Sequence, residues 1–410
     1  MKLRRLLPSG AVVALMAATI TVIGPATPST ATATPIQVLV TAGLSSPYLA
    51  ANAQMSVDAV KASAALVNAR GGILGHPIHV TVVDDAGDPT TAVTLLQQAV
   101  SGSTPPSIYI NSGPANLAAA TLPILTSDKI LSFNIGPTSN SSDPRQFPYN
   151  FDMSPSTTNY AIAFCPYVKA HGGKSVGIIY GADAYGTSLA QMMRTDCMRD
   201  HIKVVGVQSF QDTALDATPE LLALKVHKPS YLLFEGYGSV VGYVLQDISK
   251  INWKVPILGD TAVAATASVV GTPPSKGGLL GTKYLKSLKF LVFRSTVYTK
   301  KQRADVTRMI NGINAQCHCK GNFPSSLILA EEYAALPLVA AAANAVKSIE
   351  PAALARALTL LKPGSVPNTG EFPAYYFRSS SHAPNEPPSA FSFASPSALY
   401  YGQYDNPAAH

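Results

Sequence analysis

Hydrophobic positions in the first hundred residues change between two periods, and these periods predict helices alternating with strands. Apolar side chains stand at helical spacing before residue 68, at Val57, Val60, Ala64 and Val67. Gly71-Gly72 then supplies a left-handed helix stop, and residues 78–82 alternate as a strand does. Pro89 opens a second helix. With the apolar segment 36–40 in front, this order is a β-α-β-α unit, which begins a parallel doubly wound sheet.

The alternation continues to about residue 150, breaks at 149–155, and then begins again. The first series adds strands at 107–110 and 130–133 and a helix at 116–125. The second series predicts helices and strands in turn, at 159–170, 176–180, 188–201, 204–207, 221–224, 231–234, 240–251 and 256–259. Two similar series in tandem predict an α/β protein with two lobes.

The N-terminus has the pattern of an export signal. Three cations precede an apolar run at 11–24: Lys2, Arg4 and Arg5. Ala31-Thr32-Ala33 fits the small-x-small cleavage rule, so we expect a signal peptide at 1–33 and a mature start at Thr34. The apolar run is short for a membrane span, although an uncleaved anchor remains an alternative. Because the first cysteine is Cys165, we expect no lipid anchor and a soluble periplasmic or extracellular product.

Composition narrows the class of partner. Charged residues make up 13% of the chain and apolar ones 47%, which suits a large core. Without the three signal-peptide cations the formal charge falls from +7 to +4, and Lys300-Lys301 is the longest basic run, so we expect no nucleic-acid partner. About 375 mature residues exceed what one core usually holds, which again favours two lobes. We expect a monomer.

Four cysteines in an exported chain allow three pairings. Cys165 and Cys197 stand on predicted helices on either side of the strand at 176–180, which brings them to one face. We favour disulfides between Cys165 and Cys197 and between Cys317 and Cys319. The alternative, a metal site at Cys317-His318-Cys319, lacks a fourth ligand nearby, so we expect no metal and no cofactor.

Ligands of open α/β sheets bind outside the carboxyl ends of the strands, where loops and helix N-termini converge. This rule selects six segments: Gly43–Tyr48, Asn111–Pro114, Asn134–Thr138, Gly181–Gly186, Glu235–Gly238 and Asp260-Thr261. Their small and hydroxyl-bearing residues, Ser46 and Gly113 among them, suit a carboxylate held at helix N-termini.

The stretch Asn68–Pro89 also resembles the first lobe of the leucine/isoleucine/valine-binding proteins, the amino-acid branch of the type I periplasmic solute-binding family. The resemblance continues more thinly to about Leu361 and includes Glu331-Glu-Tyr-Ala-Ala-Leu. It implies two Rossmann-like doubly wound lobes joined by a three-crossover hinge. The implied boundaries are 34–153 and 284–366 for lobe 1, with helices at 301–313 and 328–346, and 154–283 and 367–410 for lobe 2. After Pro363 the resemblance implies a third crossover and a few strands on lobe 2, while the Ser/Pro/Tyr-rich composition equally permits a mobile tail.

The resemblance also implies a ligand site. Ser112, Gly136 and Thr138 match positions that hold the ligand's α-carboxylate, and Tyr185 and Tyr237 match aromatics of lobe 2. The chain departs from the family at the ammonium-binding carboxylate. Thr261 stands at that position and Asp260 precedes it, so either Asp260 binds the ammonium or the ligand has no amino group. Structural roles remain alternatives: helix caps for Ser112 and Asp260, and an interlobe surface for the tyrosines.

Enzymatic readings have less support in the sequence. There is no His-Glu-x-x-His and no Gly-x-x-x-x-Gly-Lys motif. The glycines of Gly236–Gly242 are similar to a dinucleotide fingerprint, but their spacing is one residue too long. Paired carboxylates at Asp183 and Glu235 would suit a hydrolase, without a spacing argument. The resemblance implies instead a binding protein that captures a small amino acid, carboxylate or amide and delivers it to an ABC permease complex, or a sensory receptor that signals on closure.

Overall fold

The computed structural model describes residues 33–404, so the expected signal peptide, apart from Ala33, lies outside the described residues. Two large sheets and a small one, which pairs β12 (Leu399–Tyr400) with β13 (Gln403–Tyr404), belong to the unit of the chain that begins at Thr34. The first sheet contains β1 (Ile36–Ala42), β2 (Ile78–Asp84), β3 (Ile108–Asn111), β4 (Leu131–Asn134) and β5 (Asn150–Asp152). The second contains β6 (Ser175–Gly181), β7 (Lys203–Phe210), β8 (Tyr231–Phe234), β9 (Ile257–Gly259), β10 (Leu288–Phe293) and β11 (Phe391–Ala394).

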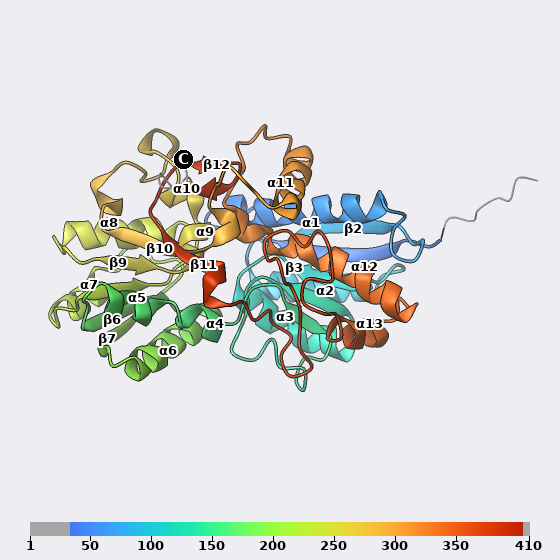
Figure 1. The fold of residues 1–410 in the computed structure, drawn as a ribbon, viewed down its shortest axis with the longest axis horizontal. Helices are drawn as coiled ribbons and strands as arrows, with labels where there is room; N and C mark the ends of the chain where they lie inside the picture. The colour runs from blue at the N-terminus through green and yellow to red at the C-terminus, as the bar shows by residue number, and fades with distance from the viewer. Residues whose placement is uncertain (1–32, 405–410) are drawn as a thin grey trace, which may run out of the picture. The chain divides into compact units, whose positions relative to one another are not determined.

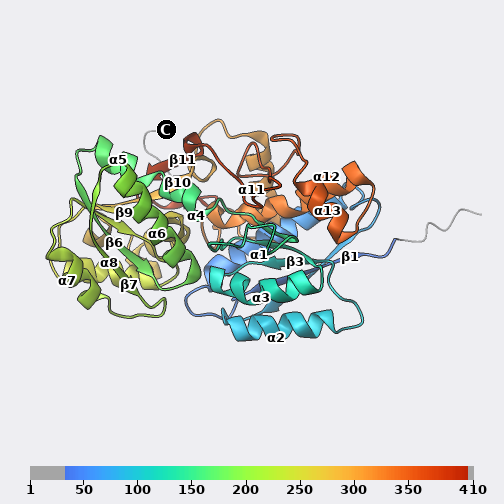
Figure 2. The same cartoon turned by 90° about the horizontal axis from the view of Figure 1, so that it is seen from below.

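The first sheet is parallel throughout, in the order β2-β1-β3-β4-β5. Its strand β1 is buried on both faces, as the apolar run at 36–40 predicts. Helices cover both faces (Figures 1 and 2): α2 (Pro89–Val100) and α3 (Ala115–Ser127) pack together on one, and α1 (Ala50–Asn68), α11 (Ala304–Cys317), α12 (Ala335–Val346) and α13 (Pro351–Leu358) lie on the other. The sheet with its helices is lobe 1.

The second sheet has the order β11-β10-β9-β8-β6-β7, and only β11 runs antiparallel to its neighbour. Its helices are α4 (Thr157–Ala161), α5 (Phe164–Ala170), α6 (Ala184–Arg199), α7 (Thr218–Lys225), α8 (Val240–Lys250), α9 (Thr261–Ala265) and α10 (Ala267–Val270). In both sheets the strand order reverses beside the first strand, at β1/β3 and at β6/β8. Such switch points are where open α/β sheets bind ligands. The expected fold class of two doubly wound lobes is confirmed.

The chain passes between the two lobes three times, but two of the passages differ from the expected boundaries. Strand β10 pairs with β9, so residues 288–293 belong to lobe 2, beyond the expected boundary at 283/284. The chain then returns at 297–303 to α11, which packs on α1. Residues after 366 first remain on lobe 1: the carbonyl of His382 accepts from the Asp152 nitrogen at 2.8 Å, and its ring stacks on Phe151. From Glu386 onward the chain contacts lobe 2: the backbone of Glu386 exchanges hydrogen bonds with the side chain of Asn159 in α4, β11 pairs antiparallel with β10, and the hydroxyl of Tyr404 donates to the Ala264 carbonyl oxygen.

Both favoured cysteine pairs are present as disulfides. Cys165 of α5 and Cys197 of α6 are fully buried, with 5.1 Å between their Cα atoms. Cys317 and Cys319 close a short loop after α11. This disulfide uses both thiols of the Cys-His-Cys segment that the metal reading required.

One apolar segment of the described chain, Leu327–Val346, meets the length and composition of a membrane span and is 83% buried. It consists of the 3-10 helix η4 (Leu327–Ala334) followed by α12. Helix η4 contacts both α1 of lobe 1 and α9 of lobe 2. The segment therefore serves as a core element that also reaches the lobe–lobe junction.

Candidate functional site

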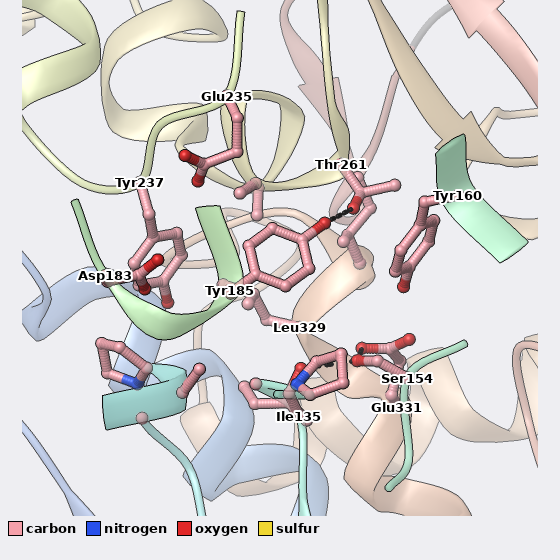
Figure 3. A pocket seen from close by; sticks show the side chains of 18 residues that line it. Ile135, Ser154, Tyr160, Asp183, Tyr185, Glu235, Tyr237, Thr261, Leu329 and Glu331 are labelled. Carbon is pink, nitrogen blue, oxygen red and sulfur yellow. Dashed lines mark hydrogen bonds between the residues drawn. The ribbon is translucent and has the colours of Figure 1, made fainter. Parts of the chain in front are cut away.

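A cavity lies where the strand ends of the two sheets meet (Figure 3). Its lining residues are Gly113, Pro114, Ala115, Ile135, Gly136, Pro137, Ser154, Tyr160, Asp183, Tyr185, Glu235, Tyr237, Thr261, Ala262, Ala265, Ile328, Leu329 and Glu331. Five of the six segments that the strand-end rule selects contribute to this list. We call this cavity the interlobe pocket.

Lobe 1 contributes the start of α3 and the loop after β4. Ala115, the first residue of α3, lines the pocket. Because Pro114 gives this helix no side-chain cap, no side chain occupies its first N–H groups, which suit an anionic ligand. The β4 loop approaches this helix end closely: a Cβ atom at Gly136 would lie 2.5 Å from the nitrogen of Ala115. Only glycine permits that approach.

Lobe 2 contributes three tyrosines that form one wall of the pocket: Tyr160 of α4, Tyr185 of α6 and Tyr237 after β8 (Figure 3). The ring of Tyr185 lies edge-on to that of Tyr160, with 6.3 Å between centroids. The hydroxyl of Tyr185 donates to Oδ2 of Asp260 at 3.0 Å. This hydrogen bond fixes the ring at the pocket wall.

Asp260 itself is fully buried and stands outside the pocket lining, behind Tyr185. Its Oδ1 accepts from the Val263 nitrogen at 3.0 Å and caps α9. Thr261, the next residue, is the one that lines the pocket. The sequence permits two roles for Asp260, a helix cap and a ligand contact. The structure shows the helix cap, and Asp260 does not line the pocket.

Two carboxyls from lobe 2 stand at one end of the pocket. Asp183 caps α6, since its Oδ1 accepts from the Gly186 nitrogen at 2.6 Å. Glu235 follows β8, and its Oε2 accepts from the Gly181 nitrogen at 2.8 Å. Burial and the nearby Asp212 raise the pKa of Asp183 to about 7. Burial, with Asp260 and Asp183 close by, raises the pKa of Glu235 well above its usual range.

A third carboxyl, that of Glu331 in η4, lies across the pocket from Asp183 and Glu235 (Figure 3). Its Oε2 accepts from the hydroxyl of Ser154 at 2.6 Å. Burial and the adjacent Glu332 raise the pKa of Glu331 well above its usual range. Among the residues that the structure describes, no Lys, Arg or His lines this pocket. The site is therefore an aromatic and aliphatic cavity whose charged chemistry is carried by carboxyls.

Four of the eight expected ligand residues come together in the pocket: Gly113, Gly136, Tyr185 and Tyr237. Ser112, Thr138 and Ser46 lie outside its lining, as Asp260 does. The hydroxyl of Ser112 donates to Oε2 of Glu332 at 2.5 Å, so it belongs to a buried network beneath the site. Thr138 closes a turn, with its Oγ1 accepting from the Ser141 nitrogen at 2.9 Å.

Ser154, Tyr160 and Glu331 were not expected in the site. Ser154 follows β5, a strand of three residues whose pattern is too short to recognise from sequence, although the strand-end rule would otherwise have selected it. Tyr160 lies in α4, at the start of a predicted single helix that the structure divides into α4 and α5. Glu331 lies in a segment that the sequence identifies only as a helix of lobe 1.

A second recess adjoins the pocket and shares Pro114, Asp183, Glu235 and Tyr237 with it. This outer recess is lined by Asp212 and by Tyr48, which belongs to Gly43–Tyr48, the one strand-end segment that does not line the interlobe pocket. At Gly238, a Cβ atom would lie 2.6 Å from the Tyr48 carbonyl oxygen, so the two lobes approach each other closely beside the recess.

The described residues offer little support for catalysis or metal binding. Within residues 33–404, no group of three or more His, Cys, Asp or Glu side chains is placed to hold a metal ion. Gly173-Lys-Ser175-Val-Gly177 has the spacing of a hydrolase nucleophile elbow, in which the serine sits between a strand and the following helix. Here Ser175 begins β6 instead, and its hydroxyl contacts that of Ser230 at 3.3 Å.

Two doubly wound lobes around a shared pocket define a two-lobed ligand-binding protein. Comparison with known families agrees: residues 35–387 match the model of the periplasmic binding protein family. The chain belongs to this family, whose members are binding proteins rather than enzymes.

Individual members of the family show what the chain is similar to. The Leu/Ile/Val-binding protein of Escherichia coli (strain K12) is 26% identical over 266 residues, which cover 60% of this chain and 67% of the relative. A periplasmic binding protein type 1 from Bordetella pertussis Tohama I superimposes with a TM-score of 0.76 at 20% identity, covering 88% of this chain and 96% of that one. The substrate-binding protein LivJ of a branched-chain amino acid transporter from Streptococcus pneumoniae, in complex with isoleucine, gives 0.69 at 18%, covering 90% and 97%. The resemblance to the leucine/isoleucine/valine-binding proteins is confirmed.

Proposed function

We propose that this chain is an extracytoplasmic solute-binding protein that captures a small amino acid or a related solute in the interlobe pocket. The observation that carries the proposal is the lining of that pocket. It combines the uncapped start of α3 with three tyrosines and two carboxyls of the other lobe. A zwitterion fits such a lining, because it presents an anion to a helix N-terminus, and its ammonium group beside Asp183 and Glu235 would favour their ionised forms.

In this proposal the ligand's carboxylate lies against the first turn of α3, beside Gly136. Its ammonium group is directed toward Asp183 and Glu235. In this proposal these two residues, and not Asp260, bind the ammonium group. Helices α6 and α9 already have carboxyl caps, Asp183 and Asp260, so their N-termini have less to offer an anion. The start of α3 is therefore the better anion site.

A ligand that contacts both lobes at once favours the arrangement in which they are closed around it. We propose that a membrane ABC permease complex then recognises the closed form and takes the solute. The similarity to LivJ, a transporter's substrate-binding protein, supports this partner. We also propose that the basic and apolar N-terminus is a cleaved export signal, which N-terminal sequencing of the secreted product would test by a start at Thr34.

A thermal-shift screen of the purified protein against amino acids, small carboxylates and small amides tests solute binding. One chemical class should raise the melting temperature by several degrees, since a ligand at 100 times its dissociation constant adds about 2.7 kcal/mol. A melting temperature that no small polar solute changes would contradict the proposed function.

A further inference from the structure

Glu331, which lines the interlobe pocket, has one carboxyl oxygen without a hydrogen-bond partner among the described residues. Its side chain is 4% exposed, and Oε2 is satisfied by the hydroxyl of Ser154. Its Oε1 is buried and has no hydrogen-bond partner among the described residues. The Ser154 hydroxyl also lies 2.6 Å from the Ile135 carbonyl oxygen, so its single hydrogen is shared between these two acceptors. The carboxyl is thus fixed in place with one oxygen left over.

The position of that oxygen matters because of what lies across the pocket. Asp183 and Glu235 occupy the opposite end, and the rings of Tyr185 and Tyr160 line the space between (Figure 3). The pocket therefore has a carboxyl at each end and an aromatic wall along its length. Tyrosine faces attract cations, and a cation beside Glu331 opposes the effect of burial on this carboxyl by favouring its ionised form. A buried acceptor without a donor also favours a ligand that brings one.

A purely aliphatic amino acid leaves this arrangement incomplete. With its carboxylate at α3 and its ammonium near Glu235, its side chain would extend toward Glu331 and cover Oε1 without supplying a donor. We propose that the pocket selects a diamino acid, whose side-chain amino group binds Glu331 while its α-amino group binds Asp183 and Glu235. This inference rests on the proposed function and specifies its substrate class.

The matched ligands for the test differ only in the side-chain amino group: L-lysine against L-norleucine, and L-ornithine against L-norvaline. Titration calorimetry on the full protein should give at least about tenfold tighter binding for one diamino acid than for its neutral counterpart, the usual effect of a charge-assisted hydrogen bond. A protonated Glu331 would instead pair with an acceptor, so L-glutamate is the opposing probe.

Glu331→Gln should reduce the preference for the diamino acid by about tenfold. Glu332→Gln is the control: it changes the neighbouring buried glutamate, whose Oε2 accepts from Ser112 and which does not line the pocket. This variant should keep the preference or strengthen it, because the Glu332 carboxyl that it removes is one of the groups that raise the pKa of Glu331. The ligand pairs decide the matter on the unmodified protein even if Glu331→Gln fails to fold.

Equal or tighter binding of norleucine and norvaline would overturn the inference and leave the proposed function standing. Tighter binding of glutamate than of either diamino acid would also overturn it. Binding of none of the five amino acids would overturn the inference, and the screen of other solutes would then decide the proposed function by itself.

Discussion

The phenol of Tyr185 donates a 3.0 Å hydrogen bond to Oδ2 of Asp260, while Oδ1 of the same carboxyl caps helix α9. One buried carboxyl thus ties a pocket-lining ring to the start of the helix that carries Thr261, another lining residue. Asp260 therefore positions Tyr185 and Thr261, and these two residues line the pocket in its place.

Asp260→Ala should lower both stability and ligand affinity. The lost cap costs about 0.5–2 kcal/mol, and the buried Tyr185 hydroxyl, left without its acceptor, costs about 1–3 kcal/mol more. Urea denaturation measures the loss of stability, and calorimetry measures the loss of ligand affinity. Asp260→Asn is the control, because its amide oxygen still caps α9. An alanine variant as stable as the parent would contradict this account.

Gly136→Ala tests the close approach of the β4 loop to α3. The new methyl group would lie 2.5 Å from the backbone nitrogen of Ala115, so the loop must move away from the helix end. We expect a loss of about 1–3 kcal/mol in the free energy of unfolding and weaker ligand binding. Gly177→Ala in β6 is the matched control, since its nearest new contact would be 3.4 Å, to Pro229. Equal effects of the two substitutions would argue against a special role for Gly136.

The two disulfides should contribute unequally to stability. Cys165 and Cys197 are separated by 32 positions and lie in the core of lobe 2, whereas Cys317 and Cys319 are separated by two. Loop-closure entropy predicts a loss of about 3–4 kcal/mol when alanines replace the first pair and about 1–2 kcal/mol for the second. Urea denaturation of the two double variants measures the difference. A larger loss from the Cys317 and Cys319 pair would refute the prediction.

Stability should fall as pH rises from 5 to 8. Burial raises the pKa of Glu332 to about 8 in the folded protein, while the unfolded chain has the ordinary value of 4.5. The folded state therefore holds a proton that the unfolded state has already released, and raising the pH favours unfolding. In Glu332→Gln the slope of the unfolding free energy against pH should be shallower by up to about 1.4 kcal/mol per pH unit. Urea titrations at several pH values would detect this, and an unchanged slope would count against a buried, neutral Glu332.

Periodicity was sufficient to predict most of the fold, and the failures have local causes. The strands β1, β2 and β6 carry clear apolar patterns and were located within two residues at each end. Strand β5 has three residues, too few for a period. The apolar pattern of β10 does not reveal which strand it pairs with. Because β10 pairs with β9, the chain remains in lobe 2 beyond the expected boundary at 283/284.

The candidate site was predictable to the extent that strand ends position it. Tyr185, Tyr237, Gly113 and Gly136 follow strands and line the pocket. Glu331 lies on η4, far along the chain, and reaches the pocket only because that helix packs at the lobe–lobe junction. Such tertiary placement leaves no local pattern. Asp260 shows the converse, since a strand-end position is equally suited to a helix cap.

Whether a solute is held between the tyrosine wall of lobe 2 and the start of α3 is tested most directly by titration calorimetry. The strongest solute from the thermal-shift screen would be titrated into the protein, into Tyr185→Ala, and into Tyr243→Ala, which changes a tyrosine of α8 that is 39% exposed. We predict that Tyr185→Ala weakens binding by about tenfold or more, while Tyr243→Ala binds like the parent. Unchanged affinity in Tyr185→Ala would contradict the assignment of the interlobe pocket as the ligand site.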